Sequence, residues 1–302
     1  MIDITQKKEP SEGRSLKDIR LSYSSQTTLS NCEQKYYYYK VQGLEKDPDF
    51  EDSFEAFNYG KAFHYINEKT LHDFPKSKSE FETLLVFCQT KFDLDNESKL
   101  KLKACLLVYW AMASKSGLKP VENGIEIEAS NKDYIGYLDA VMSEDDGSWW
   151  IVDLKTAGML DKGTIAQLGQ DMQLNLYSYF VPLLAEKLKL DVTKFKGCRY
   201  RVTLKSRAAY GKKDTDETFV KRVMASIKTY DFIVDKSELD PEYFYAEFLE
   251  NHKLSKKLRD SKKAPKKNFK ACFNYFRPCE YWSNCHKKET YTQALARMRL
   301  LD

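Results

Sequence analysis

Apolar residues in the first part of the chain recur every three or four positions, which is the spacing of a helix with one buried face. This spacing predicts helices over residues 55–72, 79–92 and 97–116, preceded by a helix that begins near Thr28. The pattern then changes to short runs of β-branched and aromatic residues separated by polar turns, which is typical of strands. The predicted strands cover residues 124–129, 134–142 and 149–154.

Helical and strand patterns follow one another in the second half. We expect a helix over residues 165–187, a strand at 198–204, and helices over 218–234 and 241–253. The order of helices, strand meander, helix and returning strand predicts an α/β fold in which a central mixed sheet is flanked by helices. The first helices form an N-terminal elaboration of this fold. A Cys-rich segment, 270–286, follows without a periodicity of its own.

The 302-residue chain has the composition of a globular protein, with 42% hydrophobic residues and a net charge of +4. Its polar beginning does not resemble a signal peptide, and its longest apolar stretch, around residues 106–113, is too short to cross a membrane. We therefore expect a soluble, cytoplasmic protein with no membrane partner. In that compartment, its seven cysteines indicate metal binding or burial rather than disulfides.

Two charged residues interrupt the third apolar strand. Asp153 and Lys155 are two positions apart and project from the same face, where burial is costly unless they pair or bind a ligand. A structural salt bridge explains this pair as well as a functional site does. Asp139 comes close to Asp153 if the two strands form a hairpin, and two carboxylates suit Mg²⁺ or Mn²⁺. Glu126 and Glu128 alternate on the first strand, where one joins the site or both are exposed acids.

Helical residues supply further candidates for a functional site. His64 and Glu68 are four positions apart and share one helix face, and Gln173 and Tyr177 repeat this spacing after the strands. Taken alone, a helical histidine is more often an ordinary core or surface residue than a ligand. Gln173 and Tyr177 alone would be an ordinary polar pair.

In this order and spacing, the motifs resemble those of the RecB-like branch of the PD-(D/E)XK nuclease superfamily. That branch carries a G-x-x-x-H-x-x-x-E helix, a G-x-x-D strand, a D/E-x-K strand and a Q-x-x-x-Y helix. The matching residues are Gly60, His64, Glu68, Gly136, Asp139, Asp153, Lys155, Gln173 and Tyr177. The chain departs from the family pattern at Leu138, where the family's name has proline, and at Asp153, where glutamate is more frequent.

The resemblance implies a restriction-endonuclease-like core and a DNA nuclease that depends on Mg²⁺ or Mn²⁺. By that resemblance, Lys155 positions the attacking water and offsets charge on the transition state. Gln173 and Tyr177 orient the site and the DNA strand, and Glu68 supports a metal-binding histidine. The implied metal ligands are His64, Asp139, Asp153 and the backbone carbonyl of Leu154.

The same resemblance assigns residues 21–286 to a single nuclease domain, after a flexible leader at 1–20 and before a C-terminal helix or tail at 287–302. Within this domain we expect a helical part, a catalytic core, and a basic and Cys-rich closure. These three parts cover residues 21–118, 119–235 and 236–286.

Three thiols, Cys272, Cys279 and Cys285, lie close together in the sequence, which predicts a metal site that lacks a fourth ligand. Iron–sulfur members of the family, such as AddB-type and CRISPR-adaptation nucleases, place one cysteine before the nuclease motifs and three after them. The resemblance therefore implies a [4Fe–4S] cluster with Cys32 as the fourth ligand. The first gap between the tail cysteines is longer than in the family pattern. Zn²⁺ is the alternative, and His286 can replace one thiol in such a site.

Positive charge precedes the cysteine tail. Residues 253–270 carry nine Lys or Arg and one acid, which is typical of a phosphate-binding track or of a solvated surface loop. Basic residues also alternate along and just past the strand at 198–204. The candidate DNA-binding residues are Arg199, Arg201, Lys205, Lys262, Lys263, Lys266 and Lys267.

These features favour an exonuclease that acts on DNA, single-stranded or with frayed ends, in recombination, repair or CRISPR adaptation. The sequence has no Walker motif, so a helicase or recombination partner would supply any unwinding. Two alternatives from other classes stay open. One is a nuclease-fold subunit that binds DNA without cutting it, and the other is a zinc-stapled DNA-binding module whose carboxylates are surface acids. The sequence does not indicate an oligomeric state.

Overall fold

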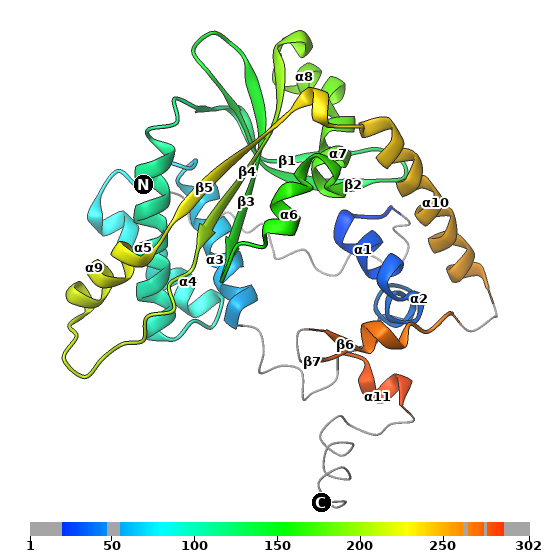
Figure 1. The fold of residues 1–302 in the computed structure, drawn as a ribbon, viewed down its shortest axis with the longest axis horizontal. Helices are drawn as coiled ribbons and strands as arrows, with labels where there is room; N and C mark the ends of the chain where they lie inside the picture. Colours follow the sequence, from blue (N-terminus) through cyan, green and yellow to red (C-terminus); the bar gives the residue numbers. More distant parts are fainter. Residues whose placement is uncertain (1–19, 47–54, 262–264, 275–276, 287–302) are drawn as a thin grey trace, which may run out of the picture. The chain divides into compact units, whose positions relative to one another are not determined.

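The computed structural model describes residues 20–46, 55–261, 265–274 and 277–286. The predicted tail at 287–302 lies outside these residues, as does almost all of the predicted leader. The chain divides into two compact units (Figure 1). Unit 1 contains residues 55–130 and 136–245, and unit 2 contains 20–46, 131–135 and the described residues after 245. The finer predicted division at 118 and 235 stays a prediction.

Unit 1 is built on a five-stranded sheet with the order β1-β2-β3-β4-β5 (Figure 1). β2 pairs with β3 antiparallel, β3 with β4 parallel, and β4 with β5 antiparallel. The sheet is therefore mixed and flanked by helices, which confirms the predicted fold class. The strands are β1 (Lys119–Ser130), β2 (Ile135–Ser143), β3 (Trp149–Ala157), β4 (Phe195–Leu204) and β5 (Thr229–Asp235).

Short polar side chains start several helices of unit 1. Ser77, Asp95, Asp171 and Thr215 each accept a hydrogen bond from a backbone N–H of the first helical turn, which would otherwise have no partner. The helices are α3 (Glu55–Lys69), α4 (Lys78–Lys91), α5 (Asn96–Ala113), α6 (Lys162–Ala166), α7 (Met172–Tyr179), α8 (Val181–Leu188), α9 (Asp216–Ser226) and the first turn of α10 (Pro241–Asp260).

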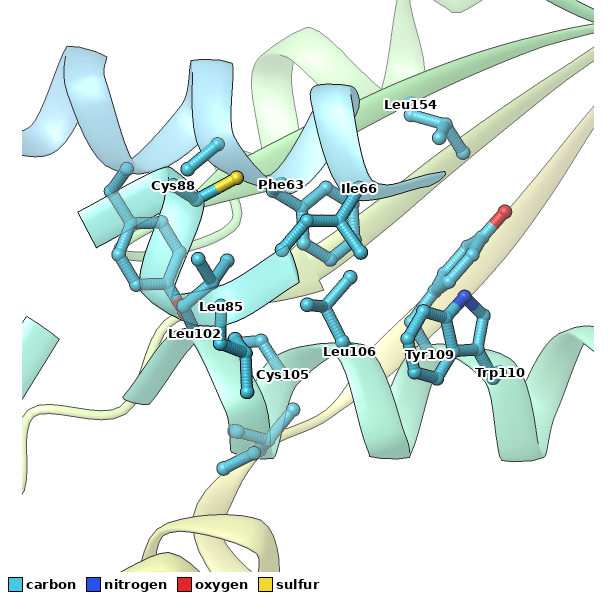
Figure 2. Close-up of a cluster of buried hydrophobic side chains, with 14 of the residues drawn as sticks. Phe63, Ile66, Leu85, Cys88, Leu102, Cys105, Leu106, Tyr109, Trp110 and Leu154 are labelled. Carbon is cyan, nitrogen blue, oxygen red and sulfur yellow. The ribbon is translucent and has the colours of Figure 1, made fainter. Parts of the chain in front are cut away.

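One face of the sheet packs against α3, α4 and α5. Side chains at alternate positions of β3, namely Trp150, Val152 and Leu154, belong to the same buried cluster as the apolar faces of these helices. Figure 2 shows Leu154 beside Phe63 and Ile66 of α3. Burying a large aliphatic or aromatic side chain contributes about 1.5–3 kcal/mol. This core therefore fixes where β3 and α3 present their remaining, polar side chains.

The buried core also contains two polar residues of the α3 region, and each has hydrogen-bond partners. Asn67 accepts from Trp110 Nε1 at 2.9 Å and donates to the Phe63 carbonyl at 2.9 Å. His72, just after α3, has Nδ1 2.9 Å from the Tyr109 hydroxyl. These bonds orient α3 on α5, because an unpaired buried polar group would be costly.

Two predicted helices differ from the structure. The helix expected over 218–234 ends at Ser226, and 229–235 is strand β5 instead. Its residues, Thr-Tyr-Asp-Phe-Ile-Val-Asp, are mostly β-branched or aromatic, and they pair with β4. The helix expected over 165–187 is divided into shorter pieces, because Asp171 caps a new helix and Pro182 begins another.

Unit 2 joins three separate segments of the chain. The turn before β2 pairs with the N-terminal segment through Leu21 and Tyr134, and the Tyr36 hydroxyl lies 2.7 Å from Ser255 Oγ of α10. Its elements are α1 (Tyr23–Asn31), α2 (Glu33–Tyr36), the π-helix η1 (Tyr37–Val41), the later part of α10, β6 (Phe273–Asn274), β7 (Arg277–Pro278) and α11 (Trp282–Cys285). Among the described residues of both units, no helix combines the length and apolarity needed to cross a membrane.

Candidate metal centre

The acid pair of unit 1 lies where β2 and β3 separate. The ladder between these strands ends at Ala140 and Val152, so Asp139 and Asp153 are the next residues of each strand. Asp139 Oδ2 accepts a 2.7 Å hydrogen bond from the Leu154 backbone N–H. The Asp139 carboxylate thus accepts the hydrogen bond that a backbone carbonyl of a paired strand would otherwise accept. This bond holds the carboxylate against β3.

Helix α3 brings His64 to Asp139. Gly60 lies one turn before His64 on α3, next to Thr156 of β3. A Cβ added at Gly60 would be 3.5 Å from Thr156 Oγ1, which shows that α3 runs close beside the end of β3. His64 Nδ1 is 3.2 Å from Asp139 Oδ1. The predicted proximity of these motifs is therefore present in the structure.

Glu126 of β1 completes a set of possible metal ligands. One ligand atom each from His64, Glu126 and Asp139 lies within 4.8 Å of the others. The backbone of Glu126 has a φ of 49°, which is uncommon for a residue other than glycine and is often found at functional sites. One nitrogen and two carboxylates are suitable ligands for a small divalent cation.

Asp153 adds a buried carboxylate beside this set, close enough to feel the charges of Asp139 and His64, although its oxygens are not among the ligand atoms within 4.8 Å. Its side chain is 1% exposed, with Oδ1 accepting from Lys155 Nζ at 2.9 Å. Oδ2 lies 2.7 Å from the same ammonium group but has no hydrogen bond of good geometry. A buried carboxylate oxygen without an aligned donor is costly, and a cation would relieve that cost. The residues present therefore fit a divalent metal ion.

A chain of hydrogen bonds connects Lys155 to the backbone of β2. Lys155 Nζ donates to Gln173 Oε1 at 3.3 Å, and Gln173 Nε2 donates to the Tyr177 hydroxyl at 2.7 Å. That hydroxyl donates to the Tyr137 carbonyl at 2.8 Å. Lysine can only donate and a carbonyl can only accept, so the direction of every bond in the chain is fixed. Gln173 and Tyr177 thus hold the lysine in one position.

Burial and neighbouring charges have opposite effects on the pKa values of the centre. Burial would lower the pKa of His64, but the Asp139 carboxylate outweighs burial and raises it. Burial would raise the pKa of Asp139, but His64, Lys155 and the Leu154 N–H hold it below its usual value. For Asp153, burial prevails over the attraction of Lys155 and raises the pKa. A cation bound at the centre would favour the ionised form of both acids.

Three other predicted site residues pair with charged neighbours instead. Glu68 pairs with Lys69 at 3.1 Å, and no described contact joins it to His64. The expectation that Arg201 contacts DNA is wrong, because its side chain is 1% exposed and lies 3.1 Å from Asp231 of β5. Arg199 is 12% exposed and pairs with Asp231 at 3.2 Å.

The remaining basic candidates have different surroundings. Lys205 Nζ lies 5.3 Å from the centre of the Tyr59 ring. Lys266 and Lys267 are exposed, and Lys267 Nζ donates to the Cys285 carbonyl at 3.3 Å. Their contacts with DNA stay predictions. Lys262 and Lys263 lie outside the described residues.

In unit 2, the end of α1 and the Cys-rich tail are joined. Asn268 donates to the Asn31 carbonyl at 2.8 Å, and the Cys279 N–H donates to the Cys272 carbonyl at 2.8 Å. Burial raises the pKa of Cys272 and Cys285, and both also respond to the charge of Cys32. Burial also raises the pKa of Cys279, and the charge of Cys285 acts in the same direction, so each of the four predicted cysteines lies close enough to at least one other to interact electrostatically. Among the described residues, however, no three of their sulfurs lie within 4.8 Å of one another.

The motifs in the sequence indicated His64, Asp139, Asp153, Lys155 and Gln173, and the structure brings these residues together. Glu126 was left undecided against Glu128. In a regular strand, the side chains of Glu126 and Glu128 would point to the same face, so the sequence could not distinguish them. The structure distinguishes them by the positive φ of Glu126.

Comparison with known families agrees with this geometry. A family model described as the PD-(D/E)XK nuclease superfamily matches residues 20–286. A comparison with curated proteins finds no match.

Proposed function

Because the chain belongs to the PD-(D/E)XK nuclease superfamily, and is thus a nuclease that uses a divalent metal, we propose that it is a DNA exonuclease. Its proposed substrate is DNA with single-stranded or frayed ends. The observation that carries this proposal is the set of His64, Glu126 and Asp139 ligand atoms within 4.8 Å, beside the buried Asp153–Lys155 pair. A non-cutting subunit would have no need to keep all these groups together.

The proposed roles follow from the contacts of each side chain. His64, Glu126, Asp139 and Asp153 would hold the metal, with the Leu154 carbonyl as a further candidate. When bound, the metal supplies Lewis-acid activation of the phosphate and lowers the pKa of a bound water. Lys155 donates toward the reacting region and offsets negative charge as it grows.

The charge state of Lys155 supports an electrostatic role. Burial would lower the pKa of Lys155, but Asp153 and Asp139 outweigh burial and raise it. An ammonium that keeps its proton cannot accept one from water. Lys155 would therefore orient the water and the phosphate, while Gln173 and Tyr177 keep it in place.

We further propose that Cys32, Cys272, Cys279 and Cys285 hold a [4Fe–4S] cluster. Four thiolates around one Zn²⁺ would lie about 3.8 Å apart, given Zn–S bonds of about 2.3 Å in a tetrahedron. In every set of three of these described thiols, at least one pair of sulfurs is more than 4.8 Å apart, which is wider than a zinc site and is compatible with a larger metal group. The cluster would tie the two ends of unit 2 together. Visible absorption and iron content of the purified protein test it, and zinc without iron would contradict it.

A cleavage assay with end-labelled single-stranded and double-stranded DNA tests the main proposal. Wild type would be compared with Lys155→Ala and Asp139→Asn, in Mg²⁺ or Mn²⁺ and in chelator. Lys221→Ala and Asp145→Asn are matched controls, because both residues are exposed on unit 1 and pair only with surface charges.

We expect metal-dependent cutting that both site variants abolish and both controls retain. Shortening from one labelled end would establish exonuclease action and its polarity. If wild type binds DNA but leaves it intact with either metal, a DNA-binding subunit replaces the enzyme. Internal cuts without end shortening would keep the nuclease but reject the exonuclease.

A further inference from the structure

Two tyrosines flank the acid pair on one face of the sheet. Tyr137 precedes Asp139 by two positions on β2, so both side chains project from the same face. Tyr200 of β4 is the register partner of Asp153 across the parallel β3–β4 pair, and such partners share a face. The metal centre therefore has one aromatic side chain beside it along β2 and another across β4.

Tyr137 is held in place although its side chain is open to solvent. Its hydroxyl donates to Glu128 Oε2 at 3.1 Å, and Glu128 Oε1 accepts from Ser130 at 2.6 Å. Its carbonyl accepts from Tyr177, at the end of the chain that begins at Lys155. The residue is nevertheless 43% exposed, whereas Leu138 next to it is fully buried. A ring that only filled the core would be buried as well.

Tyr200 is the first of three aromatic residues that reach β5, the edge strand of the sheet. Its partner on β5 is Phe232, and the Phe232 ring stacks on Tyr230 with centroids 5.8 Å apart. All three side chains are half-buried. On the same face, Ile151, Cys198 and Val234 form a register row that is fully or almost fully buried. The two aromatic members of the row of Asp153, Tyr200 and Phe232 are therefore more exposed than this neighbouring row.

Flat aromatic rings beside a phosphate-cutting centre suit one kind of ligand. Every nucleobase has a π-face, and base–aromatic stacking is tolerant of sequence. In a duplex, each base face is already covered by its neighbours, so only unpaired nucleotides can use such rings. Tyr137 is suited to this because its hydroxyl and carbonyl are fixed, so less freedom is lost on binding.

We propose that Tyr137 and Tyr200 stack on the unpaired bases next to the phosphate that the centre holds, and so select single-stranded DNA. This inference rests on the proposed nuclease function and names the residues that give it specificity. Phosphate contacts alone would not distinguish a single strand from a duplex end.

Binding of a single-stranded oligonucleotide in Mg²⁺ tests the proposal, with phosphorothioate linkages to prevent cutting and 2-aminopurine as a fluorescent base. Tyr137→Ala and Tyr200→Ala should each weaken binding about tenfold, as expected for the loss of one stacked base. The quenching of 2-aminopurine should also decrease. Tyr137→Phe keeps the ring and should bind within about twofold of wild type, which is small against one stacking contact. Tyr210→Ala, at a tyrosine that is 38% exposed on the loop before α9, is the matched control.

The salt dependence of DNA binding distinguishes a stacking contact from a phosphate contact. The slope of log affinity against log salt should be unchanged in Tyr137→Ala, because no phosphate contact is lost. Tyr137→Leu keeps apolar volume without a π-face, and wild-type binding by this variant would overturn the proposal. Unchanged binding and quenching in both alanine variants would overturn it too.

Cleavage by wild type in Mn²⁺ distinguishes the two proposals. If wild type cuts and the tyrosine variants keep its preference for single strands, only the stacking inference fails. If wild type does not cut, the proposed function fails, and the quenching measurement still decides whether the tyrosines stack.

Discussion

Stability at mildly acidic pH should depend on one buried histidine, His72. It follows α3 with a φ of 62° and is 6% exposed. Its Nδ1 lies 2.9 Å from the Tyr109 hydroxyl, which can donate to a neutral imidazole. Burial favours this neutral form, because a charged imidazole would lose its solvation. We predict that wild type loses stability in acid because His72 becomes protonated on unfolding. A variant whose side chain at this position does not titrate should lack this loss.

The magnitude follows from the shift in pKa. Burial, with the charge of Arg201 and of His64 acting in the same direction and Asp139 opposing them, lowers the pKa of His72 from 6.5 to about 4. Between these values, the unfolded chain binds a proton that the folded chain does not. The stability contributed by neutral His72 is therefore complete above the unfolded pKa of 6.5 and falls as the pH decreases toward 4. At pH 5 the loss is about 2 kcal/mol relative to pH 7.5.

The comparison is between wild type and His72→Asn. Asparagine provides an oxygen that can accept from Tyr109, tolerates a positive φ, and does not titrate. Urea unfolding in chelator would be followed by the fluorescence of Trp110, Trp149 and Trp150, which all lie in unit 1. All other titrating groups are common to both proteins, so their effects cancel in the difference.

Wild type should lose about 2 kcal/mol more than His72→Asn between pH 7.5 and pH 5. Equal losses in the two proteins would refute the reasoning. That outcome would mean that folded His72 accepts a proton as readily as an exposed histidine, despite its contact with Tyr109.

Three further outcomes follow from other contacts. Tyr177→Phe breaks the chain that holds Lys155, so single-turnover cutting should slow about 10- to 100-fold with DNA affinity retained; an unchanged rate would show that the lysine needs no such support. Glu126→Gln should raise the Mn²⁺ concentration for half-maximal cutting at least about tenfold, whereas Glu122→Gln, exposed on the same strand, should leave it unchanged. Asn67→Leu leaves the Trp110 N–H buried without its partner and should cost about 2 kcal/mol in urea unfolding. A cost near zero would mean that water replaces the amide.

Short-range spacing carried most of the information about the centre. The i, i+2 spacing of Asp153 and Lys155 and the turn between β2 and β3 are local features, so the sequence was enough to predict their convergence. The orientation of Glu126 depends on one unusual backbone angle, which residue types do not reveal. The orientation of Glu126 was therefore found only in the structure.

The errors about Arg201 and about β5 have a common cause. Residues 218–234 were expected to be one helix, so Asp231 had no predicted place beside β4. In the structure Asp231 lies on β5 opposite Arg201, and their ion pair is buried against the helices. A basic residue on a strand indicates a DNA contact only if no acid faces it from the next strand, and pairing between distant segments decides that.

The bond from the Leu154 N–H to Asp139 also bears on which ions the centre would select. One carboxylate oxygen of Asp139 is committed to the fold, so a single oxygen is left for a ligand. Large ions such as Ca²⁺ take six to eight oxygens and often use both atoms of a carboxylate, while Mg²⁺ accepts one oxygen from each of a few acids and keeps several waters. Bidentate binding here would compete with the hydrogen bond from the Leu154 N–H. We therefore predict that the centre disfavours large cations such as Ca²⁺ even without substrate.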